Sequence, residues 1–290
     1  MSNNNFRFAI FIITHKRAEN QLTLKSLRRS GYSGKIYFVV DDLDPQMQRY
    51  IDKFGRENVL IFNKASVRFD EMDNFDDRRS SSYGRNMCFS FANQLNLSHF
   101  LILDDDYTSF KFRYPEDGHL KSASIIHFDD VVSAFVDFLD ESGALTVCFA
   151  QAGDFIGGLN AHSGGAYIKK LHRKAMNCFF CRTDRPFEFP GRINEDVNAY
   201  TTLGNKGELM FTVTDVAITQ PITQSAQGGM TEVYKDSGTY VKSFYSVIGS
   251  PQAVRVENMG GNGSNTKRRI HHRVEKRFCY PMILDEKWKK

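Results

Sequence analysis

The stretch that decides the fold is HFLILDDDY, residues 99–107. Its first five residues predict a short buried strand, and three aspartates follow that strand directly, at Asp104, Asp105 and Asp106. Adjacent carboxylates repel one another and are costly to bury unpaired, but a divalent cation removes that cost. Mg²⁺ and Mn²⁺ prefer carboxylate oxygen and are often bound together with substrate phosphates. The stretch therefore predicts a metal site beside a diphosphate; an acidic turn that caps the next helix is the alternative.

The segments before this stretch alternate between strand and helix character. Residues 6–14 (FRFAIFIIT) form a near-continuous apolar run, which is typical of a strand buried on both faces of a parallel sheet. Leucines at a rough helical spacing predict a helix over residues 20–30, and residues 35–40 (KIYFVV) return to strand character before Asp41 and Asp42. The same criteria predict a helix over 46–54, a strand over 58–63, a polar loop over 64–82 and a helix over 83–95. This order is the opening of a nucleotide-binding α/β unit.

The second half of the chain is less regular. We expect a helix over residues 128–139, a strand over 144–150, glycine-containing loops over 153–165 and a sheet-like segment over 209–218. The sequence contains no internal repeat and no proline-rich linker. We therefore predict one α/β domain over residues 1–290, with an elaborated C-terminal half.

Composition excludes several classes of protein. With 41% hydrophobic and 25% charged residues, the chain is neither disordered nor fibrous. Residues 1–5 are polar and the following apolar run is too short for a signal peptide or a membrane span, so we expect a soluble, cytoplasmic protein with no membrane partner. Five cysteines fit no disulfide framework, and Cys178 and Cys181 lack a second pair at zinc spacing, so neither disulfides nor zinc are predicted.

Positive charge gathers near the C-terminus. The net charge of +4 is well below that of a dedicated DNA-binding domain. The basic segment contains Lys267, Arg268, Arg269, His271, His272, Arg273, Lys276 and Arg277. A phosphate-binding surface and a solvated tail both explain this pattern, and the sequence leaves the two open.

The succession of motifs resembles that of the GT-A glycosyltransferases. The matching motifs are Ile12-Ile13-Thr14 with Arg17, Val39-Val40-Asp41-Asp42, Gly84-Arg85-Asn86 and Leu101-Ile102-Leu103-Asp104-Asp105-Asp106. The resemblance implies a Rossmann-like mixed sheet flanked by helices. It also implies a half that binds a nucleotide sugar, residues 1–110, and an acceptor-binding half, residues 111–290.

The resemblance assigns roles to individual residues. It implies that the donor contacts are Thr14, Arg17, Asp41, Asp42, Arg85, Asn86, Asp104 and Asp105. It places Asp104 and Asp106 at a Mn²⁺ or Mg²⁺ ion, with Asp106 as the direct ligand, and adds His271 as a late histidine ligand. A contact of His271 and His272 with solvent or nucleic acid alone remains the alternative.

A second acidic motif follows at residues 193–197 (INEDV). It resembles the later motif of the same family, in which a carboxylate faces the acceptor hydroxyl. Asp196 or Glu195 would then act as the general base, and such a carboxylate favours inversion at the sugar carbon. Acidic residues stabilised by a helix dipole would give the same pattern.

Residues 79–86 (RSSSYGRN), 104–107 (DDDY) and 194–196 (NED) are similar to the glycosyltransferases associated with ten-eleven-translocation oxygenases, which include phage enzymes. That similarity implies transfer from a uridine diphosphate sugar to the hydroxyl of 5-hydroxymethylcytosine or 5-hydroxymethyluracil in DNA. The expected acceptor and DNA contacts are Gly157, Gly158, His162, Lys267, Arg268 and Arg269. Glycine-rich loops of this kind more often form simple turns, which is the alternative for Gly157 and Gly158.

Three alternatives remain at this point. A nucleotidyltransferase also uses acidic metal ligands after a strand, but no glycine-rich phosphate loop follows residues 6–14. A glycosyltransferase with a non-DNA acceptor shares the donor motifs. A noncatalytic nucleic-acid-binding module is the third, because a fold does not guarantee a function. The sequence does not indicate the sugar or the oligomeric state.

Overall fold

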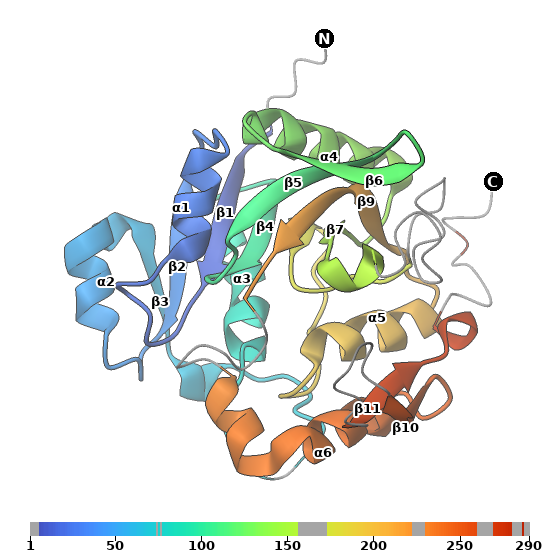
Figure 1. Ribbon diagram of the computed structural model, residues 1–290. Coiled ribbons are helices and arrows are strands. Elements are labelled where there is room, and N and C mark those ends of the chain that lie inside the picture. The colour runs from blue at the N-terminus through green and yellow to red at the C-terminus, as the bar shows by residue number, and fades with distance from the viewer. Residues whose placement is uncertain are drawn as a thin grey trace.

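A nine-stranded mixed sheet forms the centre of the molecule (Figure 1). The computed structural model describes residues 6–73, 75, 77–155, 173–221, 230–259, 269–279 and 286. The strand order is β3-β2-β1-β4-β8-β7-β9-β5-β6. The strands are β1 (Phe8–Ile13), β2 (Ile36–Asp41), β3 (Val59–Phe62), β4 (His99–Asp104), β5 (Ser109–Glu116), β6 (His119–Ser124), β7 (Thr146–Ala150), β8 (Phe179–Arg182) and β9 (Met210–Thr219). The expected α/β architecture, a mixed sheet flanked by helices, is confirmed.

The N-terminal half is a parallel unit. Strand β1 is almost wholly buried and pairs in parallel with both β2 and β4, which explains its unbroken apolar sequence. In this register Ile13 lies opposite both Val39 and Asp104, so the carboxyl ends of three strands meet. The flanking helices are α1 (Leu22–Arg29), α2 (Met47–Phe54) and α3 (Ser82–Gln94). All the helices and strands expected in this half are confirmed.

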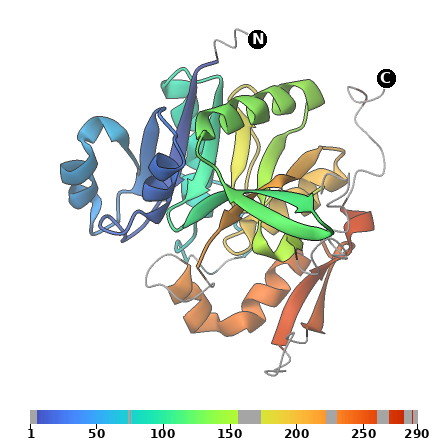
Figure 2. The same cartoon turned by 45° about the horizontal axis from the view of Figure 1, so that its top comes forward.

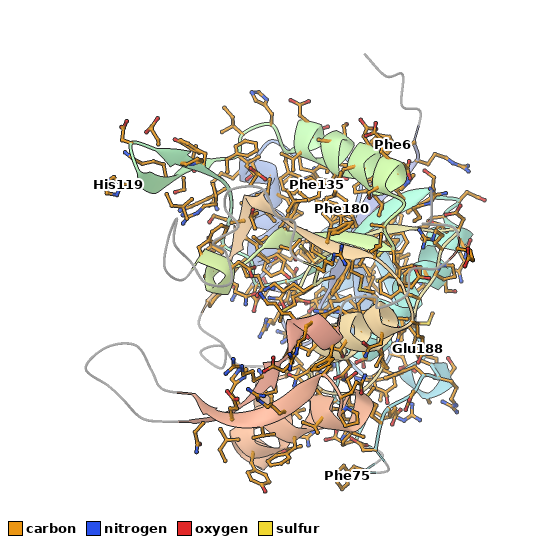
Figure 3. The ribbon with its side chains drawn as sticks, turned by 90° about the vertical axis from the view of Figure 1, so that its right-hand side faces the viewer. Phe6, Phe75, His119, Phe135, Phe180 and Glu188 are labelled. Atoms are coloured by element: carbon orange, nitrogen blue, oxygen red, sulfur yellow. The ribbon has the colours of Figure 1, made fainter. Side chains whose placement is uncertain are left out.

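The second half extends the same sheet. Helix α4 (Phe128–Ser142) and strands β7 and β9 confirm the expected elements. Phe135 of α4 packs on Phe180 of β8 with ring centroids 4.9 Å apart, inside the core that Figure 3 shows between helix and sheet. Strand β8 runs antiparallel to its neighbours β4 and β7, so its amino end lies at the same edge as their carboxyl ends.

Helices and a hairpin from the C-terminal part lie beside that edge. They are α5 (Glu195–Asn205), α6 (Thr231–Gly249), β10 (Val254–Met259) and β11 (Arg269–Val274). Figures 1 and 2 show α6 and the β10–β11 hairpin side by side. Residues 269–274 of the basic segment are therefore a strand and not a tail, because β11 pairs along its whole length with β10. Lys276 and Arg277, which follow β11, are exposed to solvent. Within the described residues, no helix is both long enough and apolar enough to cross a membrane.

Candidate active site

A cavity of about 460 Å³ gathers residues that follow β1, β2 and β4 together with the start of α5 and the strand β11. Its lining includes most of the residues expected from the sequence, namely Thr14, Arg17, Asp41, Arg85, Asp104, Asp105, Asp106, Glu195, Asp196 and His271. The two acidic motifs, about ninety positions apart in sequence, therefore face one space.

Two of the three aspartates are already bound by neighbours. Asp105 is 4% exposed and accepts hydrogen bonds from Thr14 Oγ1 at 2.5 Å and from Arg17 Nη1 at 2.6 Å. Asp104 accepts from Arg85 Nη2 at 2.7 Å and from Tyr107 Oη at 3.2 Å. Asp105 thus anchors the loop after β1, while Asp104 keeps one side toward the cavity.

Asp106 differs from its two neighbours. Its nearest described cation is Arg17, with Nη1 3.6 Å from Oδ2, and its side chain is 34% exposed. Burial, followed by the charges of Asp104 and Asp105, raises the pKa of Asp106 to about 7. Negative charge is therefore in excess here, and the oxygen donors suit Mn²⁺ or Mg²⁺.

The side chains alone do not complete a metal site. Within the described residues, no three His, Cys, Asp or Glu side chains stand close enough together to hold an ion. Substrate phosphate commonly supplies the remaining ligands of Mg²⁺ sites, so two aspartates at a diphosphate fit such an ion. Metal binding by Asp104 and Asp106 stays a prediction.

Arg85 connects the two acidic motifs. Its side chain is 3% exposed and lies over the rings of Phe179 and Phe189, at 5.1 and 5.9 Å from their centroids. Its guanidinium lies 2.7 Å from Asp104 and 3.2 Å from Glu195. Arg85 was expected to contact the donor, and the described contacts show in addition that it holds two carboxylates in place.

Glu195 and Asp196 form the first turn of α5. Asn194 before them has a left-handed backbone, with φ 54°, which turns the chain into the helix. Glu195 accepts a hydrogen bond from Ser81 Oγ at 2.6 Å, and Asp196 accepts one from the Val197 N–H at 2.7 Å. Burial and the charge of Glu195 raise the pKa of Asp196 to about 6. A carboxylate with that pKa is suited to accepting a proton near neutral pH.

The two histidines of β11 line the same cavity. His271 Nδ1 lies 2.7 Å from the carbonyl oxygen of His272, and the two rings are 4.3 Å apart. Burial and the neighbouring His271 lower the pKa of His272 to about 3, so this ring is neutral at physiological pH. The expected contact of His271 with a metal stays a prediction.

Two polar side chains that were not expected from the sequence, those of His15 and Lys64, line the cavity beside Asp41. His15 Nδ1 lies 2.8 Å from Asp41 Oδ2, and Lys64 Nζ lies 3.7 Å from the same oxygen. Burial opposes ionisation of Asp41, but the His15 hydrogen bond and the Lys64 charge outweigh it and lower the pKa of this carboxyl. Lys64 follows β3, so only the parallel pairing of β2 and β3 reveals its place.

Several expected residues lie elsewhere. Asn86 exchanges two hydrogen bonds with the backbone of Phe189, and Asp42 accepts one from the Lys64 N–H at 2.9 Å. Neither belongs to the described lining of the cavity, so their expected donor contacts gain no support. Arg269 begins β11. Gly157, Gly158, His162, Lys267 and Arg268 lie outside the described residues.

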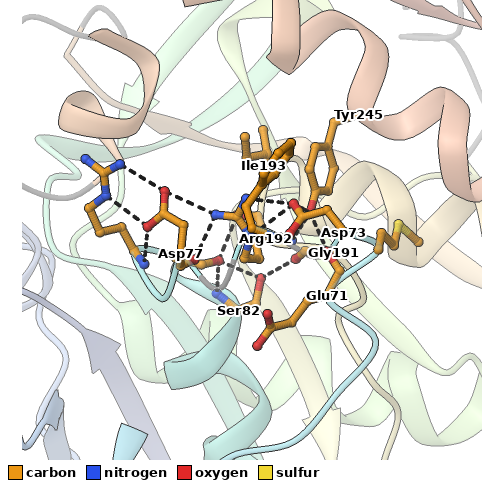
Figure 4. Close-up of polar contacts among 12 residues, drawn as sticks. Glu71, Asp73, Asp77, Ser82, Gly191, Arg192, Ile193 and Tyr245 are labelled. Atoms are coloured by element: carbon orange, nitrogen blue, oxygen red, sulfur yellow. Dashed lines mark hydrogen bonds and ion pairs between the residues drawn. The ribbon is translucent and has the colours of Figure 1, made fainter. Parts of the chain in front are cut away.

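A buried ion-pair cluster joins the segment before α3 to the segment before α5 (Figure 4). Arg192 is 3% exposed and donates to Asp73 through Nη2 at 2.6 Å, and Tyr245 of α6 donates to the same carboxylate at 2.5 Å. Ser82 Oγ donates to the Gly191 carbonyl at 2.6 Å. The loop over residues 64–82, expected to be polar, is thereby tied to α5 and α6.

Comparisons with solved structures find distant likenesses. A mannosyltransferase from Pyrobaculum calidifontis, in complex with GDP-Man and Mn²⁺, is 15% identical, with 85% of this chain and 65% of that chain covered and a TM-score of 0.48. S. aureus TarS 1-349 in complex with UDP is 15% identical, with coverages of 73% and 59% and a TM-score of 0.40. Glucosyl-3-phosphoglycerate synthase from Mycobacterium tuberculosis is 11% identical, with coverages of 94% and 91% and a TM-score of 0.44. The chain spans less than two thirds of the first two proteins.

Sequence comparison is more specific. No curated protein matches the chain significantly. The family model for TET-associated glycosyltransferases matches residues 8–229, which include both acidic motifs and the whole nine-stranded sheet. The chain therefore belongs to the TET-associated glycosyltransferase family.

Proposed function

We propose that this protein transfers a sugar from a nucleoside diphosphate sugar, uridine diphosphate being the expected carrier, to the hydroxyl of a 5-hydroxymethylpyrimidine in DNA. The observation that carries the proposal is the single cavity that joins Asp104 and Asp106 to Glu195 and Asp196. Family membership supports sugar transfer as the chemistry.

Different residues of the cavity would bind the nucleoside and the diphosphate of the donor. His15, Asp41 and Lys64 offer polar contacts to the nucleoside end. Asp104 and Asp106 would hold a divalent metal, which when bound would stabilise the negative charge of the departing diphosphate. The donor would thus lie along the carboxyl ends of the parallel strands, where ligands bind in open α/β sheets.

Asp196 is the proposed general base. The acceptor oxygen would bond to the anomeric carbon while the bond from that carbon to the diphosphate breaks. The electron pair would leave with the diphosphate and the hydroxyl proton would pass to the Asp196 carboxylate. Direct attack of this kind inverts the configuration at the sugar carbon. Arg85 and Ser81 would keep Glu195 beside Asp196 during the step.

DNA as the acceptor is suggested by membership of the TET-associated glycosyltransferase family, together with the similarity of residues 79–86, 104–107 and 194–196 to enzymes of that group. The hydroxyl of a base in a duplex must reach the anomeric carbon, and extrusion of the nucleotide is one route. A different acceptor with the same donor chemistry remains the second candidate, because the residues proposed to bind the donor would act in the same way in both cases.

Mass spectrometry of nucleosides tests the proposal. DNA that contains 5-hydroxymethylcytosine or 5-hydroxymethyluracil is incubated with the protein, Mn²⁺ and a panel of nucleotide sugars, and then digested. We expect one modified nucleoside to gain the mass of a hexose or pentose. If one nucleotide sugar is hydrolysed in a metal-dependent reaction but no nucleoside gains mass, the glycosyltransferase assignment would stand and the acceptor would be a molecule other than DNA.

Binding of nucleotide and metal should also be visible as stabilisation. A ligand that binds only the native state at about a hundred times its Kd stabilises that state by about 2.7 kcal/mol. We therefore expect Mn²⁺ together with uridine diphosphate to raise Tm clearly, while either one alone raises it less. A noncatalytic module without a nucleotide site would show no metal-dependent shift in the same thermal scans.

Asp196→Asn should lower kcat by about a hundredfold or more, because general bases typically contribute at least that factor. The amide has nearly the same shape but cannot accept the proton, so Kd for the donor should change little. Single-turnover rates and donor titrations separate the two quantities. Asp117→Asn, at the exposed tip of the β5–β6 hairpin, is the matched control. Collapse of donor affinity in Asp196→Asn would rule out its role as base.

A further inference from the structure

We propose that three amide side chains, Gln151, Asn177 and Gln220, form the subsite that binds the neutral sugar ring of the donor and selects among sugars. The inference rests on the proposed function, since it names the part of the donor that this end of the cavity holds. All three residues line the cavity with Asp104 and Asp106.

Topology places the three amides beyond the aspartates. In the order β2-β1-β4-β8-β7-β9, the last three strands lie on the opposite side of β4 from β1 and β2. Gln151 follows β7, Gln220 follows β9, and Asn177 precedes β8, which runs antiparallel. A donor with its nucleoside at β1 and β2 and its diphosphate at β4 therefore extends its sugar over these residues.

Two of the amides are held together and tied to the aspartates. Asn177 Nδ2 donates to Gln220 Oε1 at 3.2 Å. The Asn177 backbone is left-handed, with φ 63°, and its carbonyl accepts from Tyr107 Oη at 2.6 Å; the same hydroxyl reaches Asp104. Each amide offers two donor hydrogens and one acceptor oxygen, so one shared bond leaves capacity on both side chains for a ligand.

Gln151 supplies the most direct sign of a missing partner. Its Nε2 is buried and has no hydrogen-bond partner among the described residues. Its backbone N–H donates to Asp154 Oδ2 at 2.9 Å, which fixes the start of the loop. A buried donor without a partner is destabilising, and native structures keep few of them. A ligand oxygen in the cavity would satisfy this nitrogen.

The chemistry of this end suits a neutral sugar. Hydroxyl groups both donate and accept hydrogen bonds, as amides do. Met176 and Pro221 line the cavity nearby and offer apolar contact to the C–H groups of a ring. The carboxylates of Asp104, Asp106 and Glu195 face the same space, so a sugar that carries its own carboxylate would be repelled.

Binding measurements on the full chain with Mn²⁺ test this subsite. Calorimetry compares uridine and guanosine diphosphate with their glucose, galactose, mannose, N-acetylglucosamine, arabinose and glucuronate derivatives. We expect one neutral sugar derivative to bind the wild-type protein about tenfold more tightly than its nucleoside diphosphate, and the glucuronate derivative to gain nothing. Gln151→Ala should weaken binding of that derivative by about three- to tenfold, the contribution of one hydrogen bond, and leave the nucleoside diphosphate unaffected.

Matched variants make each outcome decisive. Gln94→Ala on the exposed surface of α3 should change neither affinity. Gln220→Ala replaces Gln151→Ala if the latter lowers Tm without ligand. If the wild-type protein binds the sugar derivatives no more tightly than the nucleoside diphosphates, the sugar subsite is wrong. The proposed site for the nucleoside diphosphate would not be affected by that result. Equal weakening of both ligand types in the variant would overturn the sugar subsite as well. Absence of any nucleotide binding would overturn the proposed function and the subsite with it.

Discussion

Asp106→Ala should reduce turnover by roughly a thousandfold, about 4 kcal/mol of transition-state stabilisation, because a metal at the diphosphate contributes several kcal/mol. Asp104 and Asp105 each accept strong hydrogen bonds from arginine side chains, whereas the Asp106 carboxylate lies 3.6 Å from Arg17 and accepts a hydrogen bond from its own backbone N–H. We therefore expect the Asp106 carboxylate to contribute most to binding an ion, with Asp104 beside it. Turnover is measured with saturating donor, DNA acceptor and Mn²⁺.

The same variant should fold normally. The burial of Asp106 beside two other carboxylates is unfavourable without a cation, so its removal should leave Tm unchanged or raise it slightly. The stabilisation by Mn²⁺ with nucleotide should be lost. Asp215→Ala, at an exposed position of β9, should keep both turnover and the ligand-induced shift. If the Asp106→Ala variant turns over at close to the wild-type rate, Asp106 is not a metal ligand.

The parallel half of the fold could be predicted because its signals are local. Residues 8–13 and 36–40 are apolar throughout, since a strand between two layers has no solvent face. The carboxylates at the ends of β2 and β4 could be recognised from the adjacent residues alone. The acidic motif at Glu195 was likewise visible, and the structure places it at the same cavity.

The C-terminal half could not be predicted in the same way. Strand β5 does alternate, with Phe110, Phe112 and Tyr114 at every second position, and this signal was missed. Strand β6 is almost wholly exposed and shows no comparable pattern. Helix α6 contains glycine, threonine and several β-branched residues, whose intrinsic helix propensity is low. Its packing on α5 and on the β10–β11 hairpin decides its conformation. From the sequence alone, the basic run containing His271 could not be distinguished from a solvated tail, because its strand pairs with β10, which is separate in sequence.

Contacts between side chains that are far apart in sequence could not be predicted either. Ser81 donates to Glu195 across 114 positions, and Arg192 bonds Asp73 across 119. No spacing rule links such residues, because their meeting depends on the order of strands in the sheet. The serine run in RSSSYGRN was a visible signal, but it did not indicate which carboxylate it would contact.

Asp73→Ala should destabilise the protein by about 3–5 kcal/mol, since removing one partner of a buried ion pair leaves the other charge uncompensated. Arg192 Nε and Nη2 both donate to Asp73, and the Arg192 side chain is 3% exposed. Without Asp73, the nearest described carboxylate would be that of Asp77, 3.4 Å from Nη1, and the Asp77 carbonyl oxygen accepts from the same nitrogen at 2.8 Å. Urea unfolding measures the loss. Glu19→Ala, which breaks the exposed pair with Lys53, should leave the urea midpoint unchanged.

The dependence of this loss on pH identifies its cause. Burial opposes ionisation of Asp73, but hydrogen bonds from Arg192 and Tyr245 outweigh it and lower the pKa of the carboxyl. A lowered pKa stabilises the fold fully above the ordinary carboxyl range and loses that contribution as the pH falls through the lowered value. The difference between wild type and Asp73→Ala should therefore be constant near neutrality and shrink below about pH 4. A difference that persists unchanged in acid would mean that lost packing, and not the Arg192 charge, explains the effect.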